Sequence, residues 1–294
     1  MRGKPLESLL GRKHPVILDG AMGTELGARG VDSGLPLWSA RALIVSPSTV
    51  LQIHRDYCAA GAEIMTANTF RTTGRTFRRA GVPDRSLECT GQAVRLARQA
   101  CAREEVLVAG SLAPLEDCYH PELVPDDRSL RVEHTEQAYR LAAAGVDFLL
   151  VETMGTIREA FAACEAALKT GLEVVVSLLC RPDGLLYGGE SPVEAVNVLE
   201  PLGPAALSLN CVPARSLTPM VTHLRTLTDL PLGAYGNAGR AGREQEEEIV
   251  CDVPPEEYAR LAREWVNAGA SIVGGCCGTG IEHIRKLSTL FGTT

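Results

Sequence analysis

The sequence predicts a (β/α)8 barrel of the TIM type, formed by residues 1–294 as a single domain. Short runs rich in Val, Ile, Leu and Ala recur eight times along the chain, and each is followed by a segment with helical periodicity. Most of these runs carry few charges, as expected of parallel strands that are covered by helices. The chain length also fits, because such a barrel commonly takes about 250 residues.

The eight apolar runs define the predicted strands. They are Val16–Asp19, Glu63–Asn68, Val106–Ser111, Val146–Glu152, Glu173–Cys180, Ala206–Cys211, Leu230–Tyr235 and Ser271–Gly275. An open doubly wound sheet is the alternative, since eight strands alone do not exclude it. A linker rich in Pro, Gly or Ser is absent from the sequence, which favours one domain.

The segments between the strands have the features of helices. One apolar stripe in the segment Glu256–Ala268 has helical spacing and consists of Tyr258, Leu261, Ala262, Trp265 and Val266. Capping-box patterns predict the starts of three further helices: Thr156 with Glu159, Ser191 with Glu194, and Thr279 with Glu282.

The charge pattern excludes several classes of protein. The formal net charge is -7 and the basic residues form no run, so a nucleic-acid backbone would be repelled. The N-terminus lacks the apolar region of a signal peptide. No apolar run approaches the ~20 residues of a membrane span. We therefore expect a cytoplasmic protein that binds neither nucleic acid nor a membrane.

The ten cysteines fall into two groups. In a reducing compartment we expect no disulfide framework. Cys58, Cys101 and Cys164 lie among alanines in predicted helices, where a thiol serves as a small apolar side chain. The pair Cys276–Cys277 differs, because it lies between glycines at the end of an apolar run.

Polar residues gather where the predicted strands end. They are Asp19, Asn68, Ser111, Glu152, Asn210 with Cys211, Asn237, and Cys276 with Cys277. In a barrel the reactive groups lie at this rim. One such residue is readily a helix cap, but a whole ring needs a separate partner for each buried polar atom. The rim is therefore the predicted functional site.

Three of the rim residues are metal-ligand candidates. The sixth strand ends at Cys211 and the eighth at Cys276–Cys277, and a closed barrel brings these ends close enough for the thiolates to share one Zn²⁺. The glycines around the pair permit a turn in which both sulfurs point the same way. Three protein ligands leave a fourth position open, as in catalytic zinc sites. The alternatives are a vicinal disulfide or two buried thiols.

A glycine-rich loop, residues 18–24, follows the first strand and includes Asp19 and Gly20. Glycines allow backbone N–H groups to approach an anion, so the loop suits a phosphate or a carboxylate. It has neither the Lys of a P-loop nor the GxGxxG pattern of a dinucleotide site.

Several segments, in order along the chain, resemble the homocysteine S-methyltransferase family, a group of zinc-dependent barrels. They are residues 17–26, 66–70, 151–153, 209–211, 237–239 and 274–278. The last of these, Gly-Gly-Cys-Cys-Gly, together with the upstream Asn-Cys pair, is highly specific. The resemblance spans nearly the whole chain.

The resemblance implies an activity and the residues that perform it. Zn²⁺ would be held by Cys211, Cys276 and Cys277, homocysteine's ammonium and carboxylate by Asp19, Gly20 and Glu152, and Asn68 and Asn237 would line the pocket. A free thiol has a pKa of about 8.5, and only its thiolate is a good nucleophile. Zinc deprotonates a coordinated thiol, so homocysteine could attack a methyl group and give methionine.

The sequence constrains the identity of the methyl donor less than it constrains the metal ligands. The segment 37–43 is similar to the S-methylmethionine-using branch of the family, so we expect S-methylmethionine or another sulfonium. Betaine, or a methylated corrinoid protein acting as a methyl-carrier partner, is an alternative donor. A non-catalytic zinc- or thiol-binding protein is the alternative of a different class. Either a monomer or a homo-oligomer is compatible with the sequence.

Overall fold

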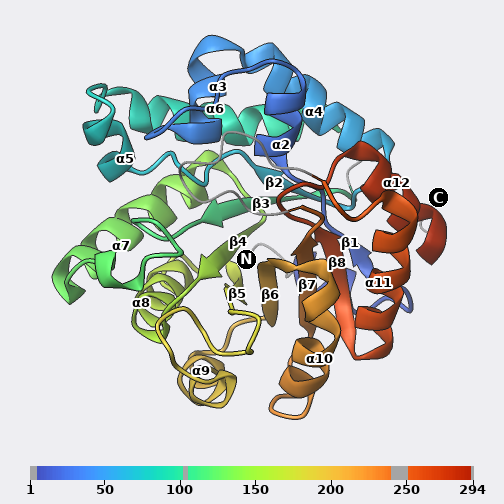
Figure 1. Ribbon diagram of the computed structural model, residues 1–294. Helices are drawn as coiled ribbons and strands as arrows, with labels where there is room; N and C mark the ends of the chain where they lie inside the picture. Colours follow the sequence, from blue (N-terminus) through green and yellow to red (C-terminus); the bar gives the residue numbers. More distant parts are fainter. Residues whose placement is uncertain (1–4, 102–104, 240–250, 293–294) are drawn as a thin grey trace.

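The computed structural model describes residues 5–101, 105–239 and 251–292, and within them it contains a closed barrel of eight parallel strands. Strand order around the barrel is β1-β8-β7-β6-β5-β4-β3-β2. Helices form an outer ring around the strands (Figure 1). The predicted barrel is confirmed, and the open doubly wound sheet is wrong.

The strands match the predicted runs, with shifted ends. They are β1 (Val16–Ile17), β2 (Ile64–Ala67), β3 (Leu107–Leu112), β4 (Phe148–Met154), β5 (Glu173–Leu178), β6 (Ala206–Pro213), β7 (Leu232–Asn237) and β8 (Ala270–Gly275). The first strand is much shorter than predicted, and β7 starts and ends two residues later.

The helices follow the strands in alternation. The α-helices are α1 (Pro5–Leu10), α2 (Met22–Ala28), α3 (Arg41–Val45), α4 (Pro47–Ala59), α5 (Gly74–Arg79), α6 (Arg85–Ala100), α7 (Asp127–Ala144), α8 (Ile157–Leu168), α9 (Pro192–Leu199), α10 (Ala214–Arg225), α11 (Pro255–Asn267) and α12 (Ile281–Phe291). The 3-10 turns are η1 (Trp38–Ala40), η2 (Pro121–Leu123) and η3 (Glu200–Leu202).

The short β1 closes the barrel. It pairs with β8 on one side, and on the other Leu18 forms a parallel bridge with Ile64 of β2. Two backbone hydrogen bonds complete this seam, from Glu63 N to Ile17 O (2.7 Å) and from Asp19 N to Ile64 O (3.0 Å). Because all eight strands are parallel and the sheet closes on itself, their carboxyl ends lie at one common rim.

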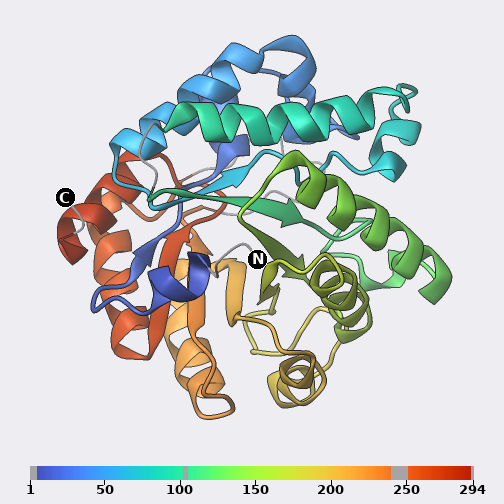
Figure 2. The same cartoon turned by 180° about the vertical axis from the view of Figure 1, so that it is seen from behind.

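The barrel interior is packed at the end opposite this rim. Leu6 and Leu9 of α1 join the apolar cluster inside the barrel, which includes Phe148 and Leu150. Helix α1 lies across this end, as the view from behind shows (Figure 2). The Glu173 carboxylate accepts from the first-turn N–H groups of Leu6 (2.9 Å) and Glu7 (2.8 Å). Such a carboxylate satisfies donors that the helix start leaves unpaired.

Helix α11 illustrates how the outer helices pack. Its predicted stripe is confirmed, with Tyr258, Leu261 and Trp265 buried against the strands. The Tyr258 hydroxyl donates to the carbonyl oxygens of Gly236 in β7 and Gly274 in β8, both at 2.8 Å. The helix therefore ties together the ends of two strands that carry rim residues.

Two of the three predicted helix caps are confirmed. Thr156 and Ser191 accept hydrogen bonds from N–H groups three residues on, and Ser191 forms a full capping box with Glu194. The cap predicted at Thr279 is wrong, because α12 starts at Ile281. The Thr279 hydroxyl donates instead to the Cys276 carbonyl (2.7 Å), so it stabilises the turn that follows β8.

One cysteine prediction is also wrong. Cys58, near the end of α4, and Cys101, after α6, form a disulfide with a Cα–Cα distance of 5.9 Å. They are 43 residues apart in sequence, and their proximity follows from the packing of α4 against α6. Cys164, by contrast, is a buried free thiol in α8, as predicted.

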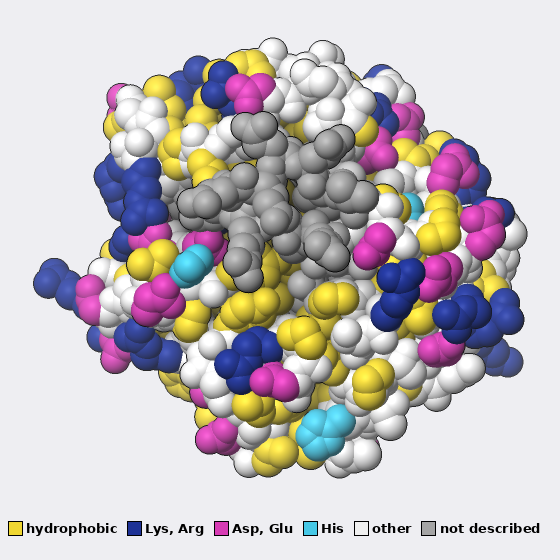
Figure 3. All heavy atoms as spheres, in the orientation of Figure 1, with side chains coloured by type: hydrophobic (Ala, Val, Ile, Leu, Met, Phe, Trp, Pro, Cys, Tyr) yellow, Lys and Arg dark blue, Asp and Glu magenta, His cyan; other side chains and the backbone are white. Residues whose placement is uncertain are grey.

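The face that looks onto the strand ends carries charges of both signs. Basic and acidic side chains alternate around its periphery rather than forming a patch of one sign (Figure 3). Among the described residues, no helix has the length and apolar character that a membrane span requires.

Candidate metal and amino-acid site

Three cysteine sulfurs meet at the rim of the barrel. The Sγ atoms of Cys211, Cys276 and Cys277 all lie within 4.8 Å of one another, and the Cys211 and Cys277 sulfurs are 3.9 Å apart. Sulfur ligands at about 2.3 Å from a tetrahedral zinc lie roughly 3.8 Å apart. The spacing and the all-thiol chemistry of the cluster therefore fit a zinc ion.

The turn after β8 brings both sulfurs of the vicinal pair to the same side. The strand ends at Gly275, so the alternation of side chains no longer applies to Cys276 and Cys277. Gly278 has a φ of +81°, which a glycine adopts readily, and its N–H donates to the Thr24 hydroxyl (3.0 Å). The glycines that motivated the metal hypothesis thus shape the turn.

Cys211 occupies a backbone conformation that is rare for its residue type. Its φ is +58°, at a bulge in β6, and the Asn237 side chain donates to its carbonyl oxygen (3.0 Å). Hydrogen bonds from the Cys276 and Cys277 thiols hold the pKa of Cys211 well below its ordinary value. The same contacts raise the pKa of Cys276 and of Cys277, so the cluster favours a single thiolate at Cys211, and a cation would stabilise the thiolate form of all three.

A buried hydrogen-bonded bridge runs from β4 across β5 to β6. The Asn210 Oδ1 accepts from the Thr153 N–H (2.9 Å) and the Ser177 hydroxyl (2.8 Å), and its Nδ2 donates to the Thr153 hydroxyl (2.8 Å). We call these three residues the Asn210 bridge. Thr153 has a φ of +64° at a bulge in β4, the counterpart of the bulge at Cys211. The bridge therefore fixes the backbone on which Glu152 and Cys211 stand.

Two buried carboxyl groups share this end of the barrel. Glu152 accepts from the Ser111 hydroxyl (2.5 Å) and the Tyr235 hydroxyl (3.3 Å). Asp19 accepts from the Thr66 N–H (2.8 Å). Burial raises the pKa of Asp19 to about 8, with a further contribution from the charge of Glu152, and burial raises the pKa of Glu152 to about 7.

The carboxyl pair has no cationic partner within the described chain. No described Lys, Arg or His forms an ion pair with Asp19 or Glu152. Two buried carboxyl groups whose charges repel each other are costly to ionise, and a positively charged ligand would relieve that cost. Together the two carboxyl groups suit an ammonium group.

The remaining predicted residues contact the protein itself. Asn68 donates to the Ser39 carbonyl (2.9 Å), which fixes the segment around η1. Gly20 lies against the Tyr57 ring, and a Cβ there would be 2.7 Å from its hydroxyl oxygen. Asn237 is buried beside Cys211, and its Oδ1 has no partner among the described residues. Asn68 is thus the predicted site residue with the clearest structural role.

Sequence reasoning missed the tyrosines of the site. The Tyr119 hydroxyl lies 3.1 Å from the Cys211 sulfur, and Tyr235 contacts Glu152. Tyr235 is the last residue of the predicted strand Leu230–Tyr235, whereas β7 continues to Asn237. Tyr119 lies in the connection between β3 and α7, and a loop residue carries no periodic signal that would place it near a particular strand.

A family model described as homocysteine S-methyltransferase matches residues 16–291. Homocysteine S-methyltransferase of Escherichia coli K12 is 32% identical over 97% of this chain and 98% of its own. Homocysteine S-methyltransferase YbgG of Bacillus subtilis is 27% identical over 97% and 96%. Selenocysteine Se-methyltransferase of Brassica oleracea is 28% identical over 92% and 87%.

Solved structures agree with these sequence matches. The crystal structure of the homocysteine methyltransferase MmuM from Escherichia coli, in its metallated form, superposes with a TM-score of 0.85 at 30% identity. The match covers 97% of this chain and 99% of that one. The family model spans almost every described residue, and the chain therefore belongs to the homocysteine S-methyltransferase family.

Proposed function

We propose that this protein transfers a methyl group from a sulfonium donor to the thiol of homocysteine, giving methionine, with Zn²⁺ held by Cys211, Cys276 and Cys277. The observation that carries the proposal is the convergence of one thiol from β6 and two from the turn after β8, beside two buried carboxyls that have no cationic partner among the described residues. Family membership and the metallated form of the relative from Escherichia coli support it.

Each group has a defined task in the proposed reaction. Zinc, when bound, would supply a positive charge that stabilises the thiolate form of homocysteine at neutral pH. Asp19 and Glu152 accept hydrogen bonds from the ammonium of the amino acid, which places its sulfur near the cysteines. Ser111 and Tyr235 orient the Glu152 carboxylate. Asn237 and the Asn210 bridge fix the backbone of Cys211.

The atoms balance without a protein acid or base at the reacting carbon. A new bond joins the homocysteine sulfur to the methyl carbon, while the bond from that carbon to the donor sulfur breaks. The donor leaves as a neutral thioether, and the thiol proton of homocysteine goes to solvent. Because a sulfonium already carries the positive charge of its leaving group, no further activation is needed.

The test is an assay of the zinc-loaded protein with homocysteine and a panel of donors, following methionine. We expect turnover with S-methylmethionine and no added cobalamin, and none with methyltetrahydrofolate alone. Turnover only with betaine, or only when a methylated corrinoid protein is supplied, would replace the sulfonium as donor. Zinc binding without turnover from any donor would favour a non-catalytic thiol-binding protein.

A further inference from the structure

Two tyrosines beside the thiol cluster have no task in the proposed reaction. Tyr119 comes from the connection between β3 and α7, and Tyr187 from the connection between β5 and α9. Their rings meet edge to face with centroids 5.3 Å apart and an interplanar angle of 69°. The Tyr119 hydroxyl lies 3.1 Å from the Cys211 sulfur. We call the two residues the tyrosine pair.

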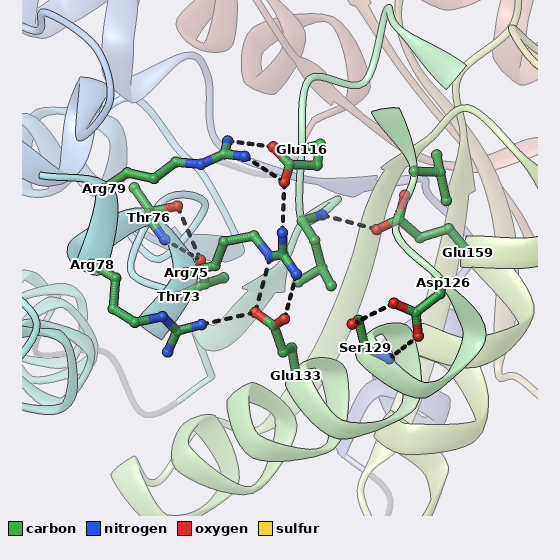
Figure 4. A network of polar contacts seen from close by, with 12 residues as sticks. Thr73, Arg75, Thr76, Arg78, Arg79, Glu116, Asp126, Ser129, Glu133 and Glu159 are labelled. Carbon is green, nitrogen blue, oxygen red and sulfur yellow. Dashed lines mark hydrogen bonds and ion pairs between the residues drawn. The ribbon is translucent and has the colours of Figure 1, made fainter. Parts of the chain in front are cut away.

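The chain that carries Tyr119 is firmly anchored. Arg75 Nη1 donates to a Glu116 oxygen (2.8 Å), and Arg79 contacts the same carboxylate (Figure 4). The neighbouring Leu115 N–H donates to Glu159 of α8 (2.9 Å). The Glu116 carboxylate is buried, and Arg75 is largely buried beside it, while the Arg79 side chain is exposed. The approach of Tyr119 to the thiols is therefore built into the fold.

Tyr187 is held in place by the end of β4. The Gly188 N–H donates to the Gly155 carbonyl (2.8 Å). A Cβ at Gly155 would lie 2.7 Å from the carbonyl oxygen of Cys118 and 3.4 Å from the Tyr187 Cβ. Because Gly155 has no side chain, the β3–α7 and β5–α9 connections can pack against each other at the end of β4.

The tyrosine pair lies farther out than the amino-acid site. Asp19 and Glu152 are 3% and 8% exposed, whereas both tyrosines are half-buried. If homocysteine is bound through the deep carboxyls with its sulfur at the cysteines, the donor must reach that sulfur from the outer side. Tyr119 stands on this side, next to Cys211.

We propose that the tyrosine pair is the subsite for the cationic end of the methyl donor, an onium group attracted to the aromatic rings. This inference rests on the proposed function, because it assumes methyl transfer at the cysteine cluster. Cations bind over aromatic faces through the negative potential of the ring, and small alkylated onium groups are favoured ligands of such sites. A second aromatic pair, Trp38 with Phe70, suits a cation less well, because the Arg71 guanidinium already stands 5.6 Å from the Phe70 ring.

The subsite also accounts for release of the product. The donor is attracted to the rings only while its sulfur is cationic. Once the methyl carbon is bonded to the homocysteine sulfur, the donor sulfur retains its bonding pair and becomes neutral. The attraction then disappears, so the thioether leaves the subsite more readily than the sulfonium entered it.

The experiment measures binding separately from turnover. We compare Tyr187→Leu with the matched variant Tyr187→Phe, both zinc-loaded and without homocysteine, by calorimetric titration with S-methylmethionine. The probe for charge is 2-amino-5-methylhexanoic acid, in which a CH group replaces the sulfonium sulfur. We expect Tyr187→Leu to weaken S-methylmethionine binding roughly 2- to 30-fold, Tyr187→Phe to bind nearly as the wild type does, and the neutral analogue to be affected much less. Tyr119→Leu and Tyr119→Phe form a second pair with the same expectation.

Two outcomes would overturn the subsite. One is unchanged S-methylmethionine binding in both Leu variants, with normal zinc content and homocysteine affinity. The other is an equal loss for the sulfonium and its neutral analogue, which would show an ordinary apolar contact. Failure of the wild type to turn over any sulfonium would count against the proposed function, and because the titration needs no turnover, the two failures are distinguishable.

Discussion

Glu152 and Asp19 are acids in an environment that disfavours their charge. Burial raises the pKa of both, and the nearby charges, Glu152 on Asp19 and Cys211 on Glu152, act in the same direction. The hydrogen bonds from Thr66, Ser111 and Tyr235 offset only part of this effect. A bound ammonium would lower the pKa of both carboxyl groups again, because it favours their charged form. When ionised, the two residues thus destabilise the free protein, whereas in the complex they would bind the ammonium group.

Replacing Glu152 by Gln separates these two effects. We expect the homocysteine KM to rise at least tenfold, because a charge-assisted hydrogen bond to the ammonium is lost, while zinc content stays at one equivalent. Steady-state kinetics and metal analysis of the same preparation measure both. An unchanged KM would remove Glu152 from the amino-acid site, and a fall in zinc content would assign it to the metal site instead.

At the scale of elements, the site depends on irregularities in two strands. Bulges in β4 and β6 place Thr153 and Cys211 at positive φ, and the Asn210 bridge joins the two bulges across Ser177 of β5. Bulges of this kind commonly re-aim side chains next to functional sites. The bridge thereby links the backbone of the metal ligand to that of the carboxylate.

Asn210→Ala tests this link. The change leaves buried hydrogen-bonding groups on Thr153 and Ser177 unpaired, which costs about 1–3 kcal/mol for each group. We expect a lower melting temperature, weaker zinc binding and a higher homocysteine KM together. Ser208→Ala is the matched control, because Ser208 lies in the same strand, is fully buried, and its hydroxyl has no partner among the described residues. Normal zinc affinity in Asn210→Ala would confine the bridge to a structural role.

At the scale of the whole molecule, the sequence predicted the barrel because each strand and each helix leaves a periodic pattern of apolar residues within its own short segment. It also predicted the thiol cluster, because a closed barrel brings all strand ends to one rim. The Cys58–Cys101 disulfide and the contact of Tyr119 with Cys211 depend on packing between distant segments, which periodicity does not encode. The hydrogen bond from Asn68 to the Ser39 carbonyl also joins segments that are distant in sequence, so periodicity does not predict it.

The buried acids also affect global stability. For Glu152 the folded-state pKa of about 7 lies above the ordinary 4.5, so the folded state binds more protons than the unfolded state between these values. The contribution of this group to stability therefore falls as pH rises from about 4.5 to 7. Buried His54, whose pKa is lowered to about 4, contributes in the opposite direction. Because the two groups act in opposite directions, the effect of Glu152 alone is measured as the difference in unfolding free energy between the wild type and a Glu152 variant.

We expect metal-free Glu152→Gln to gain stability relative to the wild type at pH 8 and to lose that advantage at pH 4. Chemical denaturation at the two pH values, with both proteins stripped of metal by a chelator, gives the difference in unfolding free energy. Saturating homocysteine and zinc should remove the advantage at pH 8. An advantage that does not depend on pH would show that the substitution acts through packing rather than through charge.

The central claim is that Cys211, Cys276 and Cys277 hold zinc with one position left for the thiol of homocysteine. Zinc K-edge X-ray absorption of the zinc-loaded protein, before and after addition of selenohomocysteine, tests it most directly. The account predicts three sulfur ligands at about 2.3 Å in the free protein and one added selenium ligand in the complex. A zinc shell of nitrogen and oxygen, or a three-sulfur shell that selenohomocysteine leaves unchanged, would contradict it.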